Sequence, residues 1–149
     1  AAKLVSGGPN AGFNLIPGQE ARGEAVLLKK HDHMTCWRKA DVPRRLGYGT
    51  NPRVPAIVCM ADIGWIITDA AGAAKRTPAT KTTGAHGYDN AAIEMRALFL
   101  AWGPSVRPGA TVGTFDNVDV DPLLRDLIGL PAGQGLDGDD APFRAALAR

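Results

Sequence analysis

Two short, uninterrupted apolar runs constrain the fold of this chain more than any other feature. One is Ile57-Val58-Cys59-Met60, inside a predicted strand from Ala56 to Ala61, and the other is Leu98-Phe99-Leu100-Ala101. Strands that are apolar at successive positions are typically covered on both faces of a sheet. We therefore predict a covered strand at 56–61 and a buried central strand from Met95 to Pro104.

Helical patterns accompany these strands. Good helix formers predict a short helix from Glu20 to Lys30, and Asp41 with Pro43 favours one helical turn within Ala40 to Leu46. From Thr114 to Leu130 an acidic turn precedes apolar residues at helical spacing, which predicts an amphipathic helix. We expect an α/β fold with a mixed sheet flanked by helices.

The remaining segments carry weaker patterns. Ala1 to Gln19 is rich in Gly, Pro and Asn and predicts an irregular lead-in. The β-branched and aromatic run Trp65 to Thr68 predicts a return strand, so that Ile57 to Thr68 forms a hairpin. Asp69 to Thr83 has the composition of a flexible excursion, and the tail 131–149 favours a last short helix from Pro142 to Ala148.

Composition excludes several classes of protein. The chain has 149 residues, 45% hydrophobic and 21% charged, with a net charge of +2, as is ordinary for a globular domain. The sequence has no basic run with interleaved aromatics, so we expect no nucleic-acid groove. No apolar segment approaches the ~20 residues of a transmembrane helix, and no signal-peptide pattern is present. Because the chain begins with Ala, we expect a processed or truncated product.

The chain has two cysteines, Cys36 and Cys59. In an oxidising compartment they would pair and close a loop of about 24 residues, which stabilises the fold by about 3 kcal/mol on the chain-entropy model. The alternative is two buried free thiols. The sequence leaves both interpretations open.

Gly84-Ala85-His86-Gly87-Tyr88-Asp89-Asn90 is the segment with the clearest chemistry. Small, flexible neighbours display one imidazole, which is among the commonest ligands of zinc. A single histidine between glycines is more often a turn residue than a ligand, because a zinc site needs three or four ligands.

Two other segments are alternative metal sites. In an extended His31-Asp32-His33 both imidazoles would lie on one face, although a partly exposed strand leading into Met34 is the simpler interpretation. The acidic cluster Asp116, Asn117, Asp119 and Asp121 would suit Ca²⁺ or Mg²⁺, although helix capping explains it more simply.

Several motifs in order resemble one family. They are Gly84 to Asn90, Met95 to Pro104 and Phe115 to Val120, with Trp37-Arg38-Lys39 and Tyr48 to Pro55 upstream. These motifs resemble the C-terminal part of nucleotide pyrophosphatase/phosphodiesterases of the alkaline phosphatase superfamily, especially the bacterial members. The similarity covers about Val26 to Leu130. It implies that residues 1–149 are the C-terminal segment of one catalytic domain.

The resemblance implies a zinc-dependent hydrolase of phosphodiester or pyrophosphate bonds, with two zinc ions and a Thr or Ser nucleophile that forms a covalent intermediate. His86 matches a zinc ligand of that family. Tyr88, Asp89 and Asn90 either shape its loop, with Asp89 accepting a hydrogen bond from His86, or begin the following turn. The nucleophile and the other ligands belong to a missing N-terminal half, so we expect this segment alone to be inactive. The resemblance also implies a periplasmic or extracellular protein.

Two alternatives remain open at this point. One is a non-catalytic structural or interaction fragment derived from the same fold. The other is a related superfamily phosphomonoesterase or sulfatase. The sequence does not distinguish nucleotides from lysophospholipids or other diesters as substrates.

Overall fold

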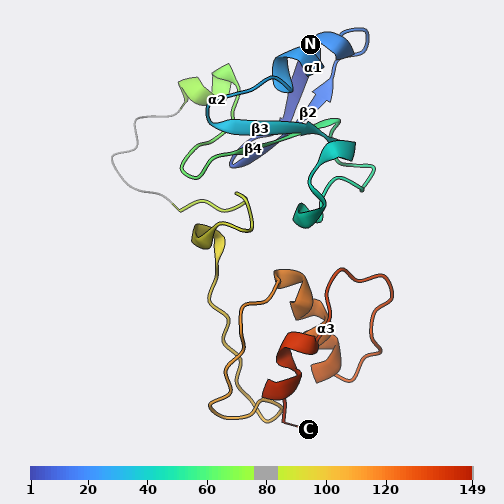
Figure 1. Cartoon of the computed structure of the whole chain (residues 1–149), viewed down its shortest axis with the longest axis vertical. Coiled ribbons are helices and arrows are strands. Elements are labelled where there is room, and N and C mark those ends of the chain that lie inside the picture. Colours follow the sequence, from blue (N-terminus) through green and yellow to red (C-terminus); the bar gives the residue numbers. More distant parts are fainter. Residues whose placement is uncertain (76–83, 149) are drawn as a thin grey trace. The chain divides into compact units, whose positions relative to one another are not determined.

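The computed structural model describes residues 1–75 and 84–148 (Figure 1). These residues divide into two compact units, Ala1–Ala97 and Leu98–Arg149. No helix in the described part of the chain is long and apolar enough to cross a membrane. Each unit has its own hydrophobic core and is described separately below.

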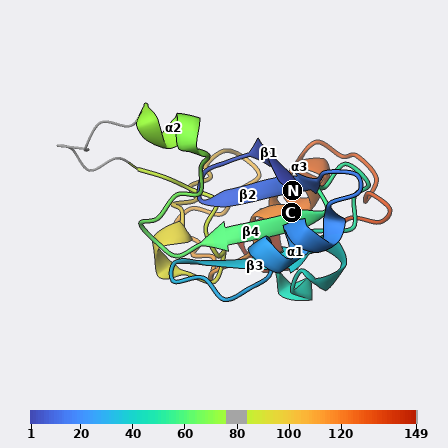
Figure 2. The same ribbon diagram turned by 90° about the horizontal axis from the view of Figure 1, so that it is seen from above.

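The first unit is built on a four-stranded antiparallel sheet. Its strands are β1 (Ala2–Ser6), β2 (Asn10–Leu15), β3 (Met34–Arg38) and β4 (Ile57–Ala61), in the order β1-β2-β4-β3 (Figure 2). The α/β class is confirmed, and every strand pairing in the described residues is antiparallel. The predicted mixture of parallel and antiparallel strands is therefore not seen in this segment.

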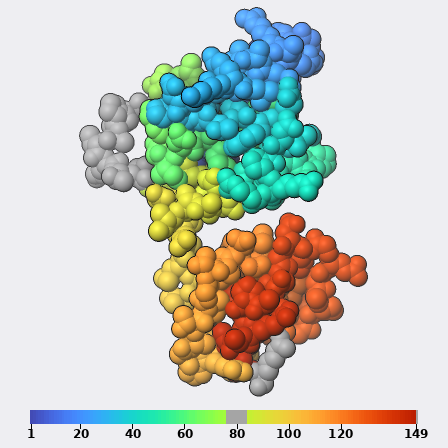
Figure 3. Space-filling model, viewed as in Figure 1, coloured from blue at the N-terminus to red at the C-terminus, as the bar shows by residue number. Residues whose placement is uncertain are grey.

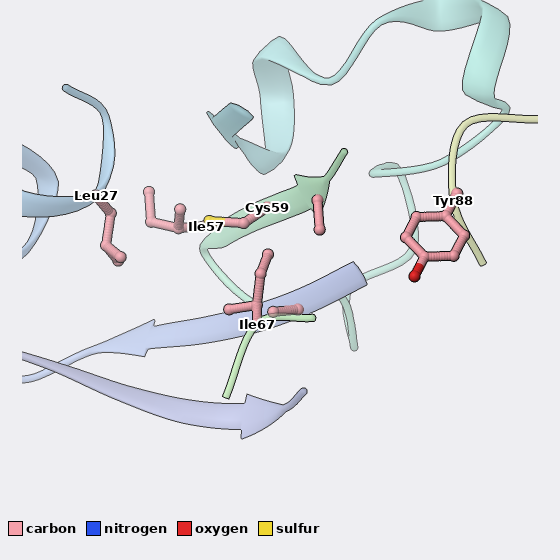
Figure 4. Packing of buried hydrophobic residues seen from close by; sticks show 7 residues of the cluster. Leu27, Ile57, Cys59, Ile67 and Tyr88 are labelled. Carbon is pink, nitrogen blue, oxygen red and sulfur yellow. The ribbon is translucent and has the colours of Figure 1, made fainter. Parts of the chain in front are cut away.

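Strand β4 is covered on both faces, as its apolar sequence predicts. Successive side chains of a strand point to opposite faces, so Ile57 and Cys59, both 0% exposed, belong to one core cluster and Val58 to another. Figure 4 shows the first cluster, with Leu27 at one end, Tyr88 at the other and Ile57, Cys59 and Ile67 between them. The second cluster packs Val58 on Val42 and Val54, with Trp37 and Leu46 at its edge.

Cys36 and Cys59 form a disulfide in this structure. The two residues face each other directly in the register of β3 and β4. The bond therefore links neighbouring strands inside the sheet, and of the two states that the sequence leaves open, the structure has the paired one.

Two helices lie beside the sheet. Helix α1 (Glu20–Leu27) matches the predicted helix but ends before its two lysines, and the His31 ring contacts the carbonyl of Leu27 at 3.0 Å. Helix α2 (Ala70–Ala74) begins at Asp69, whose carboxylate accepts a hydrogen bond from the Gly72 N–H. The rest of the predicted flexible excursion includes residues 76–83, which lie outside the described residues.

Short 3₁₀ turns complete the first unit. They span Lys39–Asp41, Arg44–Leu46 and Ile93–Met95. The single helical turn predicted within Ala40 to Leu46 is therefore two separate turns. Asp41 makes no capping hydrogen bond there, because it lies at the end of the first turn instead of before the second.

Two predictions for the first unit are wrong. The supposed lead-in Ala1 to Gln19 contains β1 and β2, whose pairing with each other and with β4 overrides their weak local pattern. The predicted hairpin from Ile57 to Thr68 does not form, because β2 and β3 occupy both edges of β4. Ile67 instead makes an isolated antiparallel bridge with Gly8.

The second unit contains helix α3 (Val120–Leu127), preceded by a 3₁₀ turn at Asn117–Asp119 and followed later by a 3₁₀ helix at Ala141–Ala146. The predicted helix is confirmed, with Leu123 packed against Phe143 and Leu147. The rings of Phe99, Phe115 and Phe143 pack on one another with centroids 4.6 to 5.5 Å apart. The predicted last helix is present as the 3₁₀ helix.

The acidic cluster before α3 serves to stabilise the helix start. Asp119 accepts hydrogen bonds from the N–H groups of Asp116 and Asp139, at 3.2 and 3.1 Å. Asp121 pairs with Arg125 one turn later, at 2.8 Å. No group of three metal-ligating side chains occurs in residues 1–75 and 84–148, so the Ca²⁺ or Mg²⁺ alternative has no support.

The predicted buried strand from Met95 to Pro104 is absent from the described residues. After the turn at Ile93–Met95 the backbone from 96 to 102 has no regular structure. Leu98, Leu100 and Trp102 are 83%, 73% and 89% exposed. An apolar run is buried only where partners cover it, and the described residues supply no neighbouring strand for this run.

Candidate metal-ligand loop

His86 lies in an exposed loop of the first unit. Its imidazole makes no hydrogen bond, ion pair or ring contact with any other residue that the structure describes. Both ring nitrogens are therefore available to a ligand. A neutral imidazole in this state is a competent donor to a divalent metal.

Gly87, directly after His86, has a backbone that suits glycine. Its φ is +98°, which L side chains rarely adopt. An added Cβ would lie 2.9 Å from the Asn10 amide nitrogen. That same amide donates a hydrogen bond to the Gly87 carbonyl at 3.1 Å, so the close approach anchors the loop to the start of β2.

Tyr88 anchors the loop to the core. It is only 9% exposed and belongs to the cluster of Ile57, Cys59 and Ile67. Its hydroxyl donates a hydrogen bond to the carbonyl of Trp65 at 3.0 Å, which satisfies the polar end of the ring.

Asp89 is held by an arginine. Both guanidinium nitrogens of Arg45 donate to its two carboxylate oxygens, at 2.6 and 2.5 Å, and the Ala91 N–H donates to one of them at 2.9 Å. The Arg45 hydrogen bonds and then the Ala91 N–H lower the pKa of Asp89 from 3.8 to about 2. The expected hydrogen bond from His86 to Asp89 is not formed, because Arg45 and Ala91 occupy the carboxylate.

Asn90 contributes a weaker contact and lies at the exposed end of the loop. Its side-chain oxygen is 3.5 Å from the same Arg45 nitrogen that binds Asp89. Figure 3 shows the residues around 90, in yellow, against those around 45, in cyan. Residues 87–90 thus have fixed partners, and His86 projects beside them.

The other two histidines do not form a metal site. His33 stacks on Trp65, with ring centroids 3.7 Å apart and planes 10° apart, and lies 3.6 Å from the Asp62 carboxylate. His31 instead contacts the end of α1 through the Leu27 carbonyl. The two imidazoles are engaged by different elements, which removes the reason for a shared metal.

The residues present fit one ligand of a metal site, not a whole site. The described residues contain no group of three His, Cys, Asp or Glu side chains able to hold an ion. A zinc ion bound by His86 would therefore take its other protein ligands from outside these residues, because zinc sites use three or four ligands.

No local sequence pattern predicts the three groups that anchor this loop. Asn10, Arg45 and Trp65 lie 77, 44 and 23 residues from their partners. Nothing in the local sequence pattern separates Arg45 from its neighbour Arg44, and such charges usually only solvate a surface. The one indication in the sequence is the charge of Asp89, because a partly buried carboxylate requires a cationic or N–H partner.

Comparison with known proteins identifies the family. Residues 3–89 match the family model for type I phosphodiesterase / nucleotide pyrophosphatase. The chain belongs to this family. The match contains β1 from its second residue, all of β2, β3 and β4, and the loop from Gly84 as far as Asp89.

Curated relatives extend the similarity along the chain. The rat ectonucleotide pyrophosphatase/phosphodiesterase family member 7 is 32% identical over 130 residues, 86% of this chain and 28% of the relative. A bis(5'-adenosyl)-triphosphatase of Xenopus laevis is 31% identical over 146 residues, 97% of this chain and 30% of the relative. The chain thus spans less than a third of the length of these two family members.

Solved structures of the family share the fold. Human ectonucleotide pyrophosphatase / phosphodiesterase 5 superposes with a TM-score of 0.84 at 29% identity, covering 99% of this chain and 38% of that one. An inactive form of the murine protein, in complex with AMP, gives a TM-score of 0.82 at 31% identity, with 99% and 37% coverage.

These matches correct the extent of the family resemblance. The motifs placed its start near Val26, whereas the family model begins at residue 3 and so includes β1 and β2. The special similarity to bacterial members stays a prediction, since the relatives named above are vertebrate proteins.

Proposed function

We propose that these residues are part of a zinc-dependent phosphodiesterase or nucleotide pyrophosphatase, in which His86 is one zinc ligand. The observation that carries the proposal is the contrast inside the loop. Residues 87–90 are each held by a partner, while the neighbouring imidazole is exposed and free of protein contacts. The anchored backbone restricts where the imidazole can reach. The unengaged ring leaves one nitrogen for a metal and the other for a hydrogen-bond acceptor, which metal-ligating histidines usually have, from polypeptide outside these residues.

The zinc site of this proposal has two metal ions, and its remaining ligands lie in polypeptide outside these residues. Support comes from coverage, since the chain spans 28% and 30% of the curated relatives. Exposed apolar residues of the second unit support it further: Leu100 and Trp102 line an open hollow of about 350 Å³ with little polar surface of its own. A missing N-terminal half of the same domain would cover them.

When bound, a pair of zinc ions would polarise the phosphate and stabilise the attacking and leaving oxygens. The role of this chain is to present the His86 imidazole, neutral and at a fixed position, to one of the two. Tyr88 and Asp89 hold the backbone next to His86, through the Trp65 carbonyl and the Arg45 guanidinium. The Thr or Ser nucleophile of the covalent mechanism belongs to the rest of the polypeptide.

The proposed substrates are nucleotides with a phosphodiester or pyrophosphate bond. Two relatives support this class, the Xenopus laevis protein by its name as a bis(5'-adenosyl)-triphosphatase and the murine protein by its complex with AMP. We also propose a periplasmic or extracellular location. The Cys36 to Cys59 disulfide supports it, because such bonds persist in oxidising compartments.

The test is the hydrolysis of a chromogenic nucleotide phosphodiester by the intact polypeptide, with and without a chelator. We expect chelation to abolish turnover and zinc to restore it. His86→Ala should lower kcat/KM by more than ~100-fold, beyond the usual effect of residues that only support a ligand. The matched control is His33→Ala, which removes an exposed imidazole that stacks on Trp65 and should change kcat/KM less than about threefold.

The outcomes separate the alternatives. Full activity in His86→Ala would remove His86 from the metal site. Hydrolysis of a phosphate or sulfate monoester in preference to the diester would favour the related phosphomonoesterase or sulfatase. A polypeptide with no activity on any of these esters and no bound zinc would support a non-catalytic fragment of the fold.

A further inference from the structure

We propose that Arg45 is a positioning residue for His86, acting through Asp89 so that its loss weakens zinc retention more than it weakens the fold. The inference rests on the proposed function, since it takes His86 as the ligand. Nothing in the family match assigns a role to Arg45. It lies in the 3₁₀ turn Arg44–Leu46, outside the loop that it holds.

Among the described side chains outside the loop, Arg45 makes the most hydrogen bonds to it. Its two terminal nitrogens bind both oxygens of Asp89, and one of them also lies 3.5 Å from the Asn90 oxygen. A planar guanidinium that binds a carboxylate at two points fixes orientation as well as distance. A lysine offers one point charge and would fix distance alone.

The three anchors of the loop act on different residues. Asn10 binds the Gly87 carbonyl and the Trp65 carbonyl binds the Tyr88 hydroxyl, so both act on the two residues directly after His86. Arg45 acts on Asp89 and Asn90, where the chain leaves the loop. Without that contact the segment after Tyr88 would keep two local hydrogen bonds to Asp89, from the N–H groups of Ala91 and Ala92. Further along, Met95 would still pack against the core, but the loop would lose its long-range side-chain contact at Asp89.

The chain provides two matched controls. Arg38 binds Glu24 at two points, both 2.7 Å, and its side chain is 52% exposed, close to the 53% of Arg45. Arg38→Met therefore removes a similar two-point ion pair away from the loop, together with a longer contact to Asp41 at 3.7 Å. Arg44→Met removes the same charge from the same 3₁₀ turn, and the Arg44 side chain makes no hydrogen bond or ion pair with the described residues.

The experiment measures zinc retention by the intact, zinc-loaded polypeptide in competition with a colorimetric chelator, and thermal unfolding midpoints alongside. We expect Arg45→Met to lower zinc affinity by about 10-fold to 100-fold, the range for residues that support a metal ligand. Arg45→Lys should fall between Arg45→Met and wild type. Arg38→Met and Arg44→Met should retain zinc like wild type, although Arg38→Met should shift the unfolding midpoint about as much as Arg45→Met.

The variant His86→Ala makes the two possible failures distinguishable. If His86→Ala retains zinc like wild type, the proposed ligand is wrong. If His86→Ala loses zinc but Arg45→Met retains it as well as Arg44→Met does, the positioning role is overturned and the proposed function stands. Should Arg45→Met fail to fold, Arg45→Lys decides the matter: affinity equal to wild type overturns the inference, and an intermediate loss supports it.

Discussion

Strand β4 and the segment Leu98 to Trp102 are both continuous apolar runs, yet they differ in every structural respect. Strand β4 has a neighbour on each edge and a cluster on each face, and Ile57 and Cys59 are 0% exposed. In the second run Leu98, Leu100 and Trp102 are at least 73% exposed and the backbone has no regular structure.

The difference shows what an apolar run does and does not specify. The run predicts that its side chains are buried in the complete fold, because exposing them costs about 25 cal/mol per Å². It does not specify where the covering residues lie in the sequence. Strand β4 has its partners in the first unit, whereas the second run requires partners that these residues do not contain.

The largest expected effect tests this contrast directly. Ile57→Ala should lower the free energy of unfolding by about 2 to 5 kcal/mol, in the 149-residue chain and in the intact polypeptide alike. The reason is that Ile57 is fully buried by residues of the first unit, so the substitution leaves the same cavity in both. Leu100→Ala should cost less than ~0.5 kcal/mol in the 149-residue chain. In the intact polypeptide it should cost about 2 to 5 kcal/mol. Chemical denaturation measures all four values, and an equal, small cost of Leu100→Ala in both would show that nothing covers the run.

A smaller effect tests whether the loop around His86, like β4, is stabilised by residues of the first unit alone. Gly87→Ala should cost about 1 to 2 kcal/mol, the penalty of a left-handed backbone for an L side chain, with an added clash against Asn10. Gly84→Ala is the matched control, because nothing lies within 4 Å of its added Cβ and its φ is not positive. If Gly87→Ala lowers the free energy of unfolding only in the intact polypeptide, the loop, like the segment Leu98 to Trp102, depends on residues outside this chain.

The smallest effect is a pH dependence of the loop's ion pair. Arg45 lowers the pKa of Asp89 from 3.8 to about 2, so the pair contributes stability above pH ~4 and loses it as pH falls toward 2. The difference in unfolding midpoint between wild type and Asp89→Asn should therefore be constant from pH 6 to about 4 and disappear near pH 2. An Asp89 carboxyl that titrates near 4 by NMR would show that the pair does not persist in solution.

Much of the fold could be predicted from local pattern, and the failures share one cause. The helix formers of Glu20 to Lys30 and the helical spacing of apolar residues after Thr114 correctly predicted α1 and α3, and the apolar run of β4 correctly predicted a doubly covered strand. Strands β1 and β2 were missed because long-range pairing with β4 stabilises them, not their own pattern. The hairpin at Trp65 failed for the same reason, since its partner edge was already occupied by distant strands.

In the candidate site too, local features could be predicted from the sequence and long-range contacts could not. The glycines and small residues around His86 correctly indicated an exposed imidazole, because backbone freedom is a local property. The groups that hold the loop are the side chains of residues 10 and 45 and the backbone carbonyl of residue 65, and contacts over such separations leave no local signal. The disulfide was an open alternative for the same reason, since the register of β3 and β4 decides it.

The most direct measurement of the central claim is anomalous X-ray diffraction at the zinc edge from crystals of the intact polypeptide. We predict a zinc peak about 2.0 to 2.1 Å from a ring nitrogen of His86, with the other ligands contributed by residues outside this segment. A fully loaded protein whose zinc peaks all lie away from His86 would contradict the account.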